Sequence, residues 1–261
     1  MSHPSPQLVE LARLAQAAGQ KIMEIYASDF HAHAKADASP VTDADVAAEA
    51  VILKGLAQLY PSIPVVAEEQ VAAGMQIEAG KRFFLVDPLD GTKEFISRNG
   101  EFTVNIGLIE NEVPIAGVVY APAVNALYAG ATNIGAFKAT IAPSQKLESE
   151  NLKPIAARAC PAGGPTILAS RSHRDPETEA FIANQKPASI TNAGSSLKFC
   201  LVAEGRADLY PRFGRTMEWD TAAGHAVLLA AGGNMTMTNG TPFTYGKNGY
   251  ANPAFIARGR P

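Results

Sequence analysis

Apolar residues recur at helical spacing near the N-terminus. Between Leu8 and Ile25 they follow steps of three and four, which places them on one face of a helix. Ser5 and Pro6, immediately before this stretch, fit the N-cap and the first helical position. The polar, alanine-rich stretch that follows, residues 28–40, predicts a loop or an irregular hairpin.

A second apolar stripe begins near Thr42 and is stopped by Pro61, so it predicts another helix. Beyond it the apolar residues form short runs bounded by turn-forming residues, which is typical of strands. The third and fourth runs are separated by Asn111 and Glu112, and we interpret them as an antiparallel pair. The first half therefore predicts two helices over an antiparallel sheet. The runs are residues 63–70, 82–87, 102–110, 113–122 and 126–140.

The composition changes between residues 141 and 165, where the chain is polar and then rich in turn-forming residues. We place a domain boundary there, between an α+β domain of residues 1–145 and an α/β domain of residues 146–261. After the boundary, predicted strands and helices alternate, which is typical of α/β folds. The strands are residues 166–170 and 207–212, and the helices are residues 175–184, 195–205 and 219–233.

The bulk composition narrows the class of protein. The chain has 261 residues, of which 47% are hydrophobic, and this is enough for a large core. A net charge of −3 and the lack of a long run of Lys and Arg argue against a nucleic-acid partner. Cys160 and Cys200 have no metal-ligand spacing and indicate reduced thiols. The start lacks the features of a signal peptide, and no apolar run approaches the ~20 residues that span a bilayer, so we expect a cytoplasmic protein.

Acidic side chains stand at the ends of the predicted elements, where a side chain can project into a cleft. Taken singly, each has an ordinary explanation as a turn former, a helix cap, a partner of the helix dipole or a solvated strand end. Taken together, these explanations weaken, because carboxylates gathered in one cleft are typical of a metal site. The acids are Asp45, Glu68, Glu69, Asp87, Asp90 and Asp220.

The segment "DPLDGT" favours a site for metal and phosphate. Asp87 and Asp90 follow an apolar run and can supply two carboxylates and a backbone carbonyl within one turn. Hard cations such as Mg²⁺ take oxygen ligands, and neighbouring ions that share carboxylates can clamp an in-line phosphoryl displacement. Gly91 lets the backbone pass close to a ligand, and the amides of Gly91 and Thr92 open a segment that can hold an anion.

Motifs in matching order and spacing resemble one enzyme family, the lithium-sensitive, Mg²⁺-dependent phosphatases. "DPLDGTKEF" resembles the family signature Asp-Pro-x-Asp-Gly-Thr-x-x-Phe, and "WDTAAG" resembles the second signature. "AEEQ" and "VTDAD" resemble the Glu-Glu element and the segment that carries a helix-start Asp. The family includes inositol monophosphatases and 3'(2'),5'-bisphosphate nucleotidases, and "GSSLKFCLVAEGRADLYPRFG" is most similar to the CysQ type of the latter. The resemblance implies the layered αβαβα sandwich of the inositol monophosphatase-like sugar phosphatases, which mixes α+β and α/β parts.

The resemblance also implies metal ligands. It implies two or three Mg²⁺ ions and inhibition by Li⁺. Asp87 would bridge two ions, Leu89 would offer its backbone carbonyl, and Glu68 rather than Glu69 would be the main glutamate. The implied ligands are Glu68, Asp87, Leu89, Asp90 and Asp220.

Catalytic roles are implied in the same way for Asp45, Thr92 and Glu68. Asp45 would pair with Thr92, while Thr92 and Glu68 would orient a metal-bound water for direct attack, without a covalent intermediate. A Ser–His–Asp nucleophile is a weak alternative, because Ser172 beside His173 lacks nucleophile-elbow spacing. The residues implied to line the phosphate and its ester are Glu68, Leu89, Asp90, Gly91, Thr92 and Asp220.

A nucleotide bisphosphate needs a second anion site. The segment "GSSLK" places small hydrogen-bond donors at a predicted helix start, which suits an anion. Each basic candidate could equally be a solvated surface charge. His225 lies inside a predicted helix, and we interpret it as a packing residue rather than a ligand. The main candidates are Ser195, Ser196, Lys198 and Arg212, and further candidates are Arg171, His173, Arg174 and Tyr210.

The leading interpretation is hydrolysis of the 3'-phosphate of adenosine 3',5'-bisphosphate to AMP, with the sulfated form PAPS as a further substrate. An inositol monophosphatase or a sugar bisphosphatase is the alternative, because the metal motifs do not discriminate between substrates. A non-catalytic metal- or nucleotide-binding regulator is an alternative of another class, and the intact set of acids argues against it. The resemblance is compatible with a monomer or homodimer and with loose association with the inner membrane face.

Overall fold

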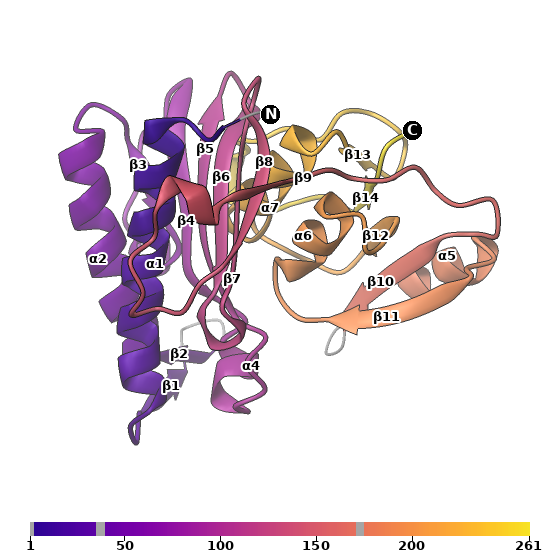
Figure 1. Ribbon diagram of the computed structural model, residues 1–261. Helices are drawn as coiled ribbons and strands as arrows, with labels where there is room; N and C mark the ends of the chain where they lie inside the picture. The colour runs from indigo at the N-terminus through magenta and orange to yellow at the C-terminus, as the bar shows by residue number, and fades with distance from the viewer. Residues whose placement is uncertain (1–2, 35–39, 171–174) are drawn as a thin grey trace.

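Helices and sheets alternate in layers through the molecule. The computed structural model describes residues 3–34, 40–170 and 175–261. Among these residues, Figure 1 shows layers in the order αβαβα, so the predicted sandwich is confirmed. The layers are helices α1 (Pro6–Tyr26) and α2 (Asp43–Leu59), a seven-stranded sheet, helices α6 (Leu197–Ala203) and α7 (Glu218–Ala230), a five-stranded sheet and helix α5 (Pro176–Asn184).

The helices α1 and α2 bury their apolar faces against the seven-stranded sheet, here called the larger sheet. The predicted start of α1 is confirmed, because Ser5 Oγ accepts a hydrogen bond of 3.2 Å from the amide of Leu8 and Pro6 is the first helical residue. In the stretch before α2, for which the sequence predicts a loop or an irregular hairpin, strands β1 (Ala32–Ala34) and β2 (Pro40–Thr42) pair antiparallel.

The strands of the larger sheet follow one another in chain order, from β3 to β9. The predicted antiparallel pair β5 and β6 is confirmed, and Asn111 and Glu112 between them both have positive φ. β3 runs parallel to β4, and the other pairs are antiparallel. The bounds are β3 (Val65–Ala67), β4 (Arg82–Asp90), β5 (Thr103–Glu110), β6 (Val113–Ala121), β7 (Ala126–Ala131), β8 (Gly135–Thr140) and β9 (Lys153–Ile155).

The strand end expected at Glu68 and Glu69 is wrong, whereas the expectation that Asp87 and Asp90 stand at the end of a strand is confirmed. β3 stops at Ala67, and Glu68 opens the short helix α3 (Glu68–Ala72) instead of ending the strand. β4 continues past Asp87 to Asp90, with a shift of register between them, before Thr92 opens α4 (Thr92–Ile96). An apolar run alone does not reveal such a shift, because it depends on how the neighbouring strand pairs.

The helix α7 lies between the two sheets, where small residues allow close packing. A Cβ at Gly107 of β5 would lie 2.9 Å from the amide nitrogen of Ala223, and one at Gly117 of β6 would meet the Ala223 carbonyl. Only glycine lets backbone approach backbone so closely. This packing fixes the first turn of α7, which carries Asp220, relative to the larger sheet.

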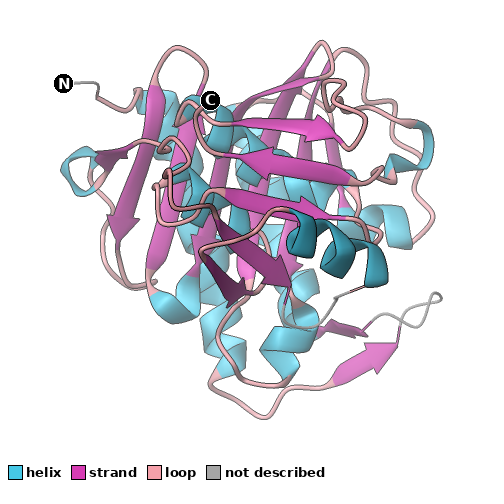
Figure 2. Ribbon diagram, turned by 90° about the vertical axis from the view of Figure 1, so that its right-hand side faces the viewer, coloured by secondary structure: helices cyan, strands magenta, loops and turns pink. Residues whose placement is uncertain are grey.

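The five-stranded sheet, here called the smaller sheet, has the order β11-β10-β12-β14-β13. Figure 2 shows its strands running across those of the larger sheet. The predicted strands β10 and β12 are confirmed, whereas β11, β13 and β14 were missed; β11 is mostly exposed and polar and therefore shows no apolar pattern. The bounds are β10 (Thr166–Ser170), β11 (Ser189–Ala193), β12 (Leu209–Arg212), β13 (Asn234–Met237) and β14 (Phe255–Arg258).

Residues from both sides of the predicted boundary share a core between the sheets. β9 lies beyond residue 145 and still belongs to the larger sheet. The division at residues 145 and 146 stays a prediction. The 3₁₀ turns are η1 (Pro122–Val124), η2 (Ser149–Asn151) and η3 (Asn248–Tyr250).

Among the described residues, none of the helices combines the length and the hydropathy that crossing a bilayer would require.

Candidate active site

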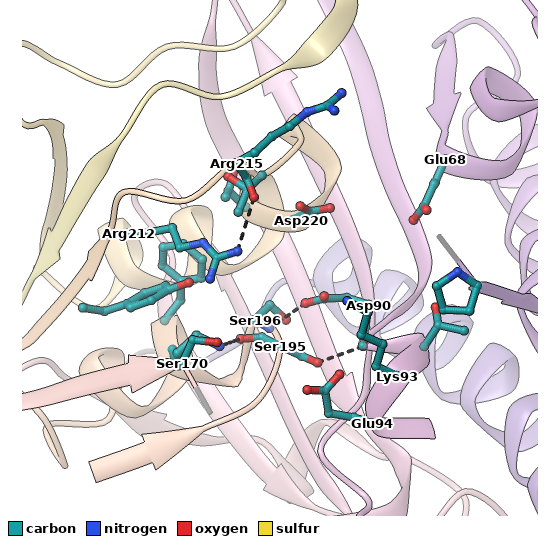
Figure 3. A pocket seen from close by; sticks show the side chains of 18 residues that line it. Glu68, Asp90, Lys93, Glu94, Ser170, Ser195, Ser196, Arg212, Arg215 and Asp220 are labelled. Atoms are coloured by element: carbon teal, nitrogen blue, oxygen red, sulfur yellow. Dashed lines mark hydrogen bonds between the residues drawn. The ribbon is translucent and has the colours of Figure 1, made fainter. Parts of the chain in front are cut away.

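A pocket of about 260 Å³ opens where the larger sheet, α7 and the smaller sheet meet (Figure 3). Three further predicted residues, Asp45, Asp87 and Leu89, lie directly behind it and are at most 2% exposed. The chain thus brings together residues that are up to 175 positions apart, from Asp45 to Asp220. The predicted residues that line the pocket are Glu68, Asp90, Gly91, Thr92, Ser195, Ser196, Lys198, Tyr210, Arg212 and Asp220.

Asp87 and Asp90 share one face of the larger sheet because of the shifted register. Asp87 pairs with Asn105 and Asp90 with Thr103, so a step of three residues on β4 faces a step of two on β5. In a regular strand, residues three apart point to opposite faces, and a bulge removes this alternation. The bulge therefore turns both carboxylates towards the pocket side. Asp87 Oδ1 also accepts a hydrogen bond of 3.0 Å from the amide of Leu89.

Asp45 connects the start of α2 with the "DGT" segment. Its Oδ2 accepts hydrogen bonds from the Thr42 amide at 2.8 Å and the Thr42 hydroxyl at 2.7 Å. Its Oδ1 accepts a hydrogen bond of 3.2 Å from Thr92 Oγ1. Asp45 is therefore both a first-turn acid of α2 and the partner of Thr92, which is the pairing that the family resemblance implied.

Asp220 lies in the first turn of α7, at the third helical position rather than at the N-cap. Its Oδ2 accepts a hydrogen bond of 2.8 Å from the amide of Met217, which closes the turn. Glu68 comes from α3 on the other side of the pocket. Figure 3 shows Glu68, Asp90 and Asp220 pointing towards a common space from three different elements.

Burial and neighbouring acids raise the pKa values of the three aspartates at this space. Burial raises the pKa of Asp87 well above its ordinary value, and Glu68, Asp90 and Asp220 raise it further. Burial raises the pKa of Asp90 to about 6, although Lys198 and the Ser196 amide lower it. Burial and then Asp90 raise the pKa of Asp220. Repulsion of this kind is relieved by a bound cation.

The oxygen atoms around this space are of the kind that binds a hard divalent cation. They belong to carboxylates and to the Leu89 carbonyl, which are the ligands that Mg²⁺ takes in proteins. In the described part of the chain, no three His, Cys, Asp or Glu side chains already converge as the ligands of one ion. Backbone amides instead hold one oxygen of each aspartate: Leu89 for Asp87, Ser196 for Asp90 and Met217 for Asp220.

Lys198 and Arg212 form the basic side of the pocket. Lys198 is 4% exposed, so it is not a solvated lysine on a helix surface. Its Nζ donates to the carbonyls of Ser195 at 2.7 Å and Ala193 at 3.2 Å, and burial lowers its pKa to about 8. Arg212 is half-buried and donates to the carbonyls of Gly214 and Arg215.

Sequence reasoning missed other residues of this side. Arg215 and Ser170 also line the pocket, and Figure 3 shows Arg215 above Arg212. The basic residue three positions after Arg212 is the one signal that could have pointed to Arg215. The candidates Arg171, His173 and Arg174, and Ser172 of the rejected nucleophile, lie outside the described residues.

His225 lies in the core behind the pocket. It is 3% exposed, and its Nδ1 lies 3.1 Å from the hydroxyl of Tyr245. Burial lowers its pKa to about 3, so the ring is neutral at physiological pH. The structure thus places His225 where the sequence interpretation did, as a packing residue.

Comparisons with known proteins agree with the fold and the motifs. The 3'(2'),5'-bisphosphate nucleotidase CysQ of Escherichia coli O157:H7 shares 46% identity over 251 residues, which cover 95% of this chain and 98% of that protein. The CysQ protein of Haemophilus influenzae shares 30% identity over 97% of this chain and 92% of its own. The resemblance to the CysQ type, inferred from the motifs, is confirmed.

Solved structures show the same likeness. The structure of CysQ from Bacteroides thetaiotaomicron, a bacterial member of the inositol monophosphatase family, matches with a TM-score of 0.81 and 39% identity, over 97% of this chain and 96% of that one. An inositol monophosphatase from Anabaena matches with a TM-score of 0.74 and 27% identity, over 97% of this chain and 90% of that one. Residues 5–259 match the sequence model of the inositol monophosphatase family. With these matches spanning nearly its whole length, the chain belongs to the inositol monophosphatase family.

Proposed function

We propose that the protein is a Mg²⁺-dependent phosphatase that hydrolyses the 3'-phosphate of adenosine 3',5'-bisphosphate to AMP and phosphate, and converts PAPS to APS in the same way. The observation that carries this proposal is the set of aspartates Asp87, Asp90 and Asp220, whose pKa values are raised by burial and by neighbouring acids around one pocket. Relatives named 3'(2'),5'-bisphosphate nucleotidase support the choice of substrate.

The metal ions would be held by Glu68, Asp87, Asp90, Asp220 and the carbonyl of Leu89, with Asp87 shared between two of them. When bound, such ions stabilise charge on the phosphoryl oxygens and lower the pKa of a coordinated water. Li⁺ inhibition is expected from the family resemblance. By the same resemblance Glu69 would not be a principal ligand.

The protein groups around the attacking water would orient it. Asp45 Oδ2 is fixed by Thr42, so Oδ1 holds the hydroxyl hydrogen of Thr92. Thr92 Oγ1 then has a lone pair to accept a hydrogen bond from the water, and Glu68 would accept another. Gly91 has φ of 93°, which a residue with a Cβ adopts only with strain, so glycine here lets the chain turn beside the phosphate.

The basic side of the pocket would bind the second phosphate of the substrate. Arg212 and Lys198 supply positive charge there, and Ser195 and Ser196 form the wall between them and Asp90. A monophosphate ester lacks this second anion, so the two basic residues would favour the bisphosphate.

Phosphate release from adenosine 3',5'-bisphosphate beside inositol 1-phosphate, with Mg²⁺ and with or without Li⁺, tests the proposal. Faster release from the nucleotide, lost with Li⁺ or a chelator, is the expected result. Preference for the inositol ester would replace the substrate but keep the metal site. Release from neither ester nor from a sugar bisphosphate, combined with tight nucleotide binding by calorimetry, would instead indicate a regulator.

Location and assembly stay predictions. A cytoplasmic enzyme, loosely held at the inner membrane face, would partition between soluble and membrane fractions in a salt-dependent way. Light scattering of the purified protein would distinguish the predicted monomer from the predicted homodimer.

A further inference from the structure

Directly behind Asp90, buried polar side chains from the two halves of the chain hydrogen-bond to one another. Ser196 Oγ donates to Asn105 Oδ1 at 2.6 Å and lies 2.8 Å from Thr103 Oγ1. Thr103 and Asn105 are fully buried in β5, and Ser196, just before α6, is 2% exposed. We call Thr103, Asn105 and Ser196 the polar hub.

The polar hub contacts the Asp90 carboxylate through Ser196. The amide of Ser196 donates a hydrogen bond of 2.7 Å to Asp90 Oδ2. Thr103 is the cross-strand partner of Asp90, and Asn105 is the partner of Asp87. Cross-strand partners share one face of a sheet, with Cβ atoms about 5 Å apart. The hub therefore lies beside both aspartates of the "DPLD" segment.

The segment that carries Ser196 is held in an unusual conformation. Ser195 has φ of +48°, which non-glycine residues adopt rarely and at a cost. Its hydroxyl is within hydrogen-bonding distance of the carbonyls of Asp90 at 2.9 Å and Glu101 at 2.7 Å. A Cβ at Gly91 would collide with this hydroxyl, so the two loops fit together only with glycine there. This fit brings the backbone of Ser196 close to Asp90, and the direction of its amide is left to the contacts of Ser196 itself.

Asn105 destabilises the fold at its position. It lies in the middle of a buried strand, where Asn is disfavoured, and its Nδ2 has no hydrogen-bond partner among the described residues. A buried donor without a partner costs about 1–3 kcal/mol. An apolar residue would avoid that cost, so the polar side chain is better explained by what it does for Ser196 and the aspartates.

We propose that the polar hub sets the direction of the Asp90 carboxylate, and that Thr103 and Asn105 are positioning residues that act through Ser196. The Ser196 amide takes Oδ2, so Oδ1 is the oxygen presented to a cation. If the Ser196 hydroxyl is released, its amide turns and Asp90 loses this orientation. Partners behind metal ligands typically change metal affinity or activity about 10- to 100-fold. The inference rests on the proposed function in one respect, that Asp90 is a Mg²⁺ ligand.

A pair of substitutions at Thr103 separates this role from packing. Thr103→Val keeps the shape and loses the hydroxyl, whereas Thr103→Ser keeps the hydroxyl and loses a methyl group. Calorimetric titration of the full-length, metal-free protein with MgCl₂ should show affinity weakened about tenfold by Thr103→Val and retained by Thr103→Ser. Urea unfolding should show that Thr103→Val is at least as stable as Thr103→Ser.

A double-mutant cycle tests whether Asn105 acts through Ser196. Ser196→Ala and Asn105→Leu should each weaken Mg²⁺ binding about tenfold, and the double variant should be no weaker than the worse single variant. Gln16→Leu is a matched control, because Gln16 is a buried amide, 6% exposed, that bonds the carbonyls of Ala142 and Gln145 outside the pocket. It should lose stability and keep Mg²⁺ affinity.

Asp90→Asn serves as the reference for the whole test. If it weakens Mg²⁺ binding while Thr103→Val and Ser196→Ala leave binding unchanged, the inference is wrong and the proposed function stands. If Asp90→Asn itself leaves Mg²⁺ binding unchanged, the metal assignment of the proposed function fails, and the inference fails with it. Should Ser196→Ala not fold, the isosteric Thr103→Val decides the question alone.

Discussion

Thr92 donates a hydrogen bond of 3.2 Å to Asp45, although the two residues lie 47 positions apart in the chain. Thr92 follows β4 in the larger sheet, while Asp45 belongs to the first turn of α2 in the outer layer. The bond therefore connects the start of helix α2 with the segment after β4 that faces the pocket. It also makes the hydroxyl of Thr92 a donor to the protein, which leaves its oxygen to accept from a water.

Asp45→Asn should lower kcat for adenosine 3',5'-bisphosphate about 100-fold, because Asp45 holds the Thr92 hydroxyl that would orient the attacking water, and misplacement of a reacting group costs about 10²-fold. In Asp45→Asn an NH₂ group replaces one of the two carboxylate oxygens. Thr42 needs the remaining oxygen, so the side chain no longer accepts the hydrogen bond from the Thr92 hydroxyl. Asp43→Asn is the matched control, since Asp43 is an exposed acid in the same helical turn. Initial rates of phosphate release check both variants. Equal loss in the two would show that helix α2, and not the Thr92 pairing, was disturbed.

Asp87→Asn should make the metal-free protein more stable while removing activity. Burial and neighbouring acids raise the pKa of Asp87, so its charge destabilises the fold when no cation is bound. Asn keeps an oxygen for the Leu89 amide. Urea unfolding in the presence of a chelator measures the change.

Asp208→Asn should change stability in the opposite direction. Burial alone would raise the pKa of Asp208, but hydrogen bonds from Arg158 and the Thr166 amide hold it below its ordinary value. Removing this charge breaks a two-point pair with Arg158, at 2.8 and 2.9 Å, and should cost about 1–3 kcal/mol. A gain in stability from Asp208→Asn would show that the contrast with Asp87 is not electrostatic.

The sequence indicated which acids would gather at the pocket, because each belongs to a short motif at the end of an element; their role as metal ligands stays a prediction. Asp220 lies in the first turn of a helix whose apolar pattern is clear, and the "DPLDGT" segment contains its own turn residues. What joins these motifs could not be predicted in the same way. The bulge that aligns Asp87 with Asp90 depends on pairing with β5, and the apolar pattern of β4 is the same with or without it.

The polar hub illustrates the limit of local patterns most clearly. Thr103 and Asn105 are two polar residues in a mostly apolar strand, and Ser196 lies 93 positions after Thr103. Their contact requires the smaller sheet and α6 to dock against β5, and no periodicity in either segment specifies that docking. β11, which leads into this loop, was missed for a similar reason, since its exposed residues carry no apolar signal.

His225 should make the protein sensitive to acid. Its pKa is about 3 in the fold, lowered by burial from an ordinary value of 6.5. Because the unfolded chain takes up the proton first, stability is fully present above pH 6.5 and falls as the pH drops towards 3. The expected slope is about 1.4 kcal/mol per pH unit.

His225→Gln should remove this part of the acid sensitivity. The test is urea unfolding at about pH 7.5, 6 and 5, with no metal in either sample. The free energy of unfolding should fall less steeply with decreasing pH in His225→Gln than in the parent protein. His31→Gln, at an exposed histidine, is the matched control for the substitution itself. Parallel curves for His225→Gln and the parent would mean that the imidazole is not held neutral in the core.

Arg212→Ala should raise KM for adenosine 3',5'-bisphosphate about 10- to 100-fold, because a hydrogen bond to a charged group is worth about 1.5–3 kcal/mol. The guanidinium lines the pocket and is held by the carbonyls of Gly214 and Arg215, so its position is fixed before substrate arrives. KM for adenosine 3'-monophosphate, which has no second phosphate, should change little. Arg206→Ala, at a side chain 71% exposed and outside the pocket, controls for the loss of net charge. Equal increases of KM for both nucleotides would place Arg212 at the scissile phosphate instead of the second one, and the basic side of the pocket would then have no part in choosing a bisphosphate.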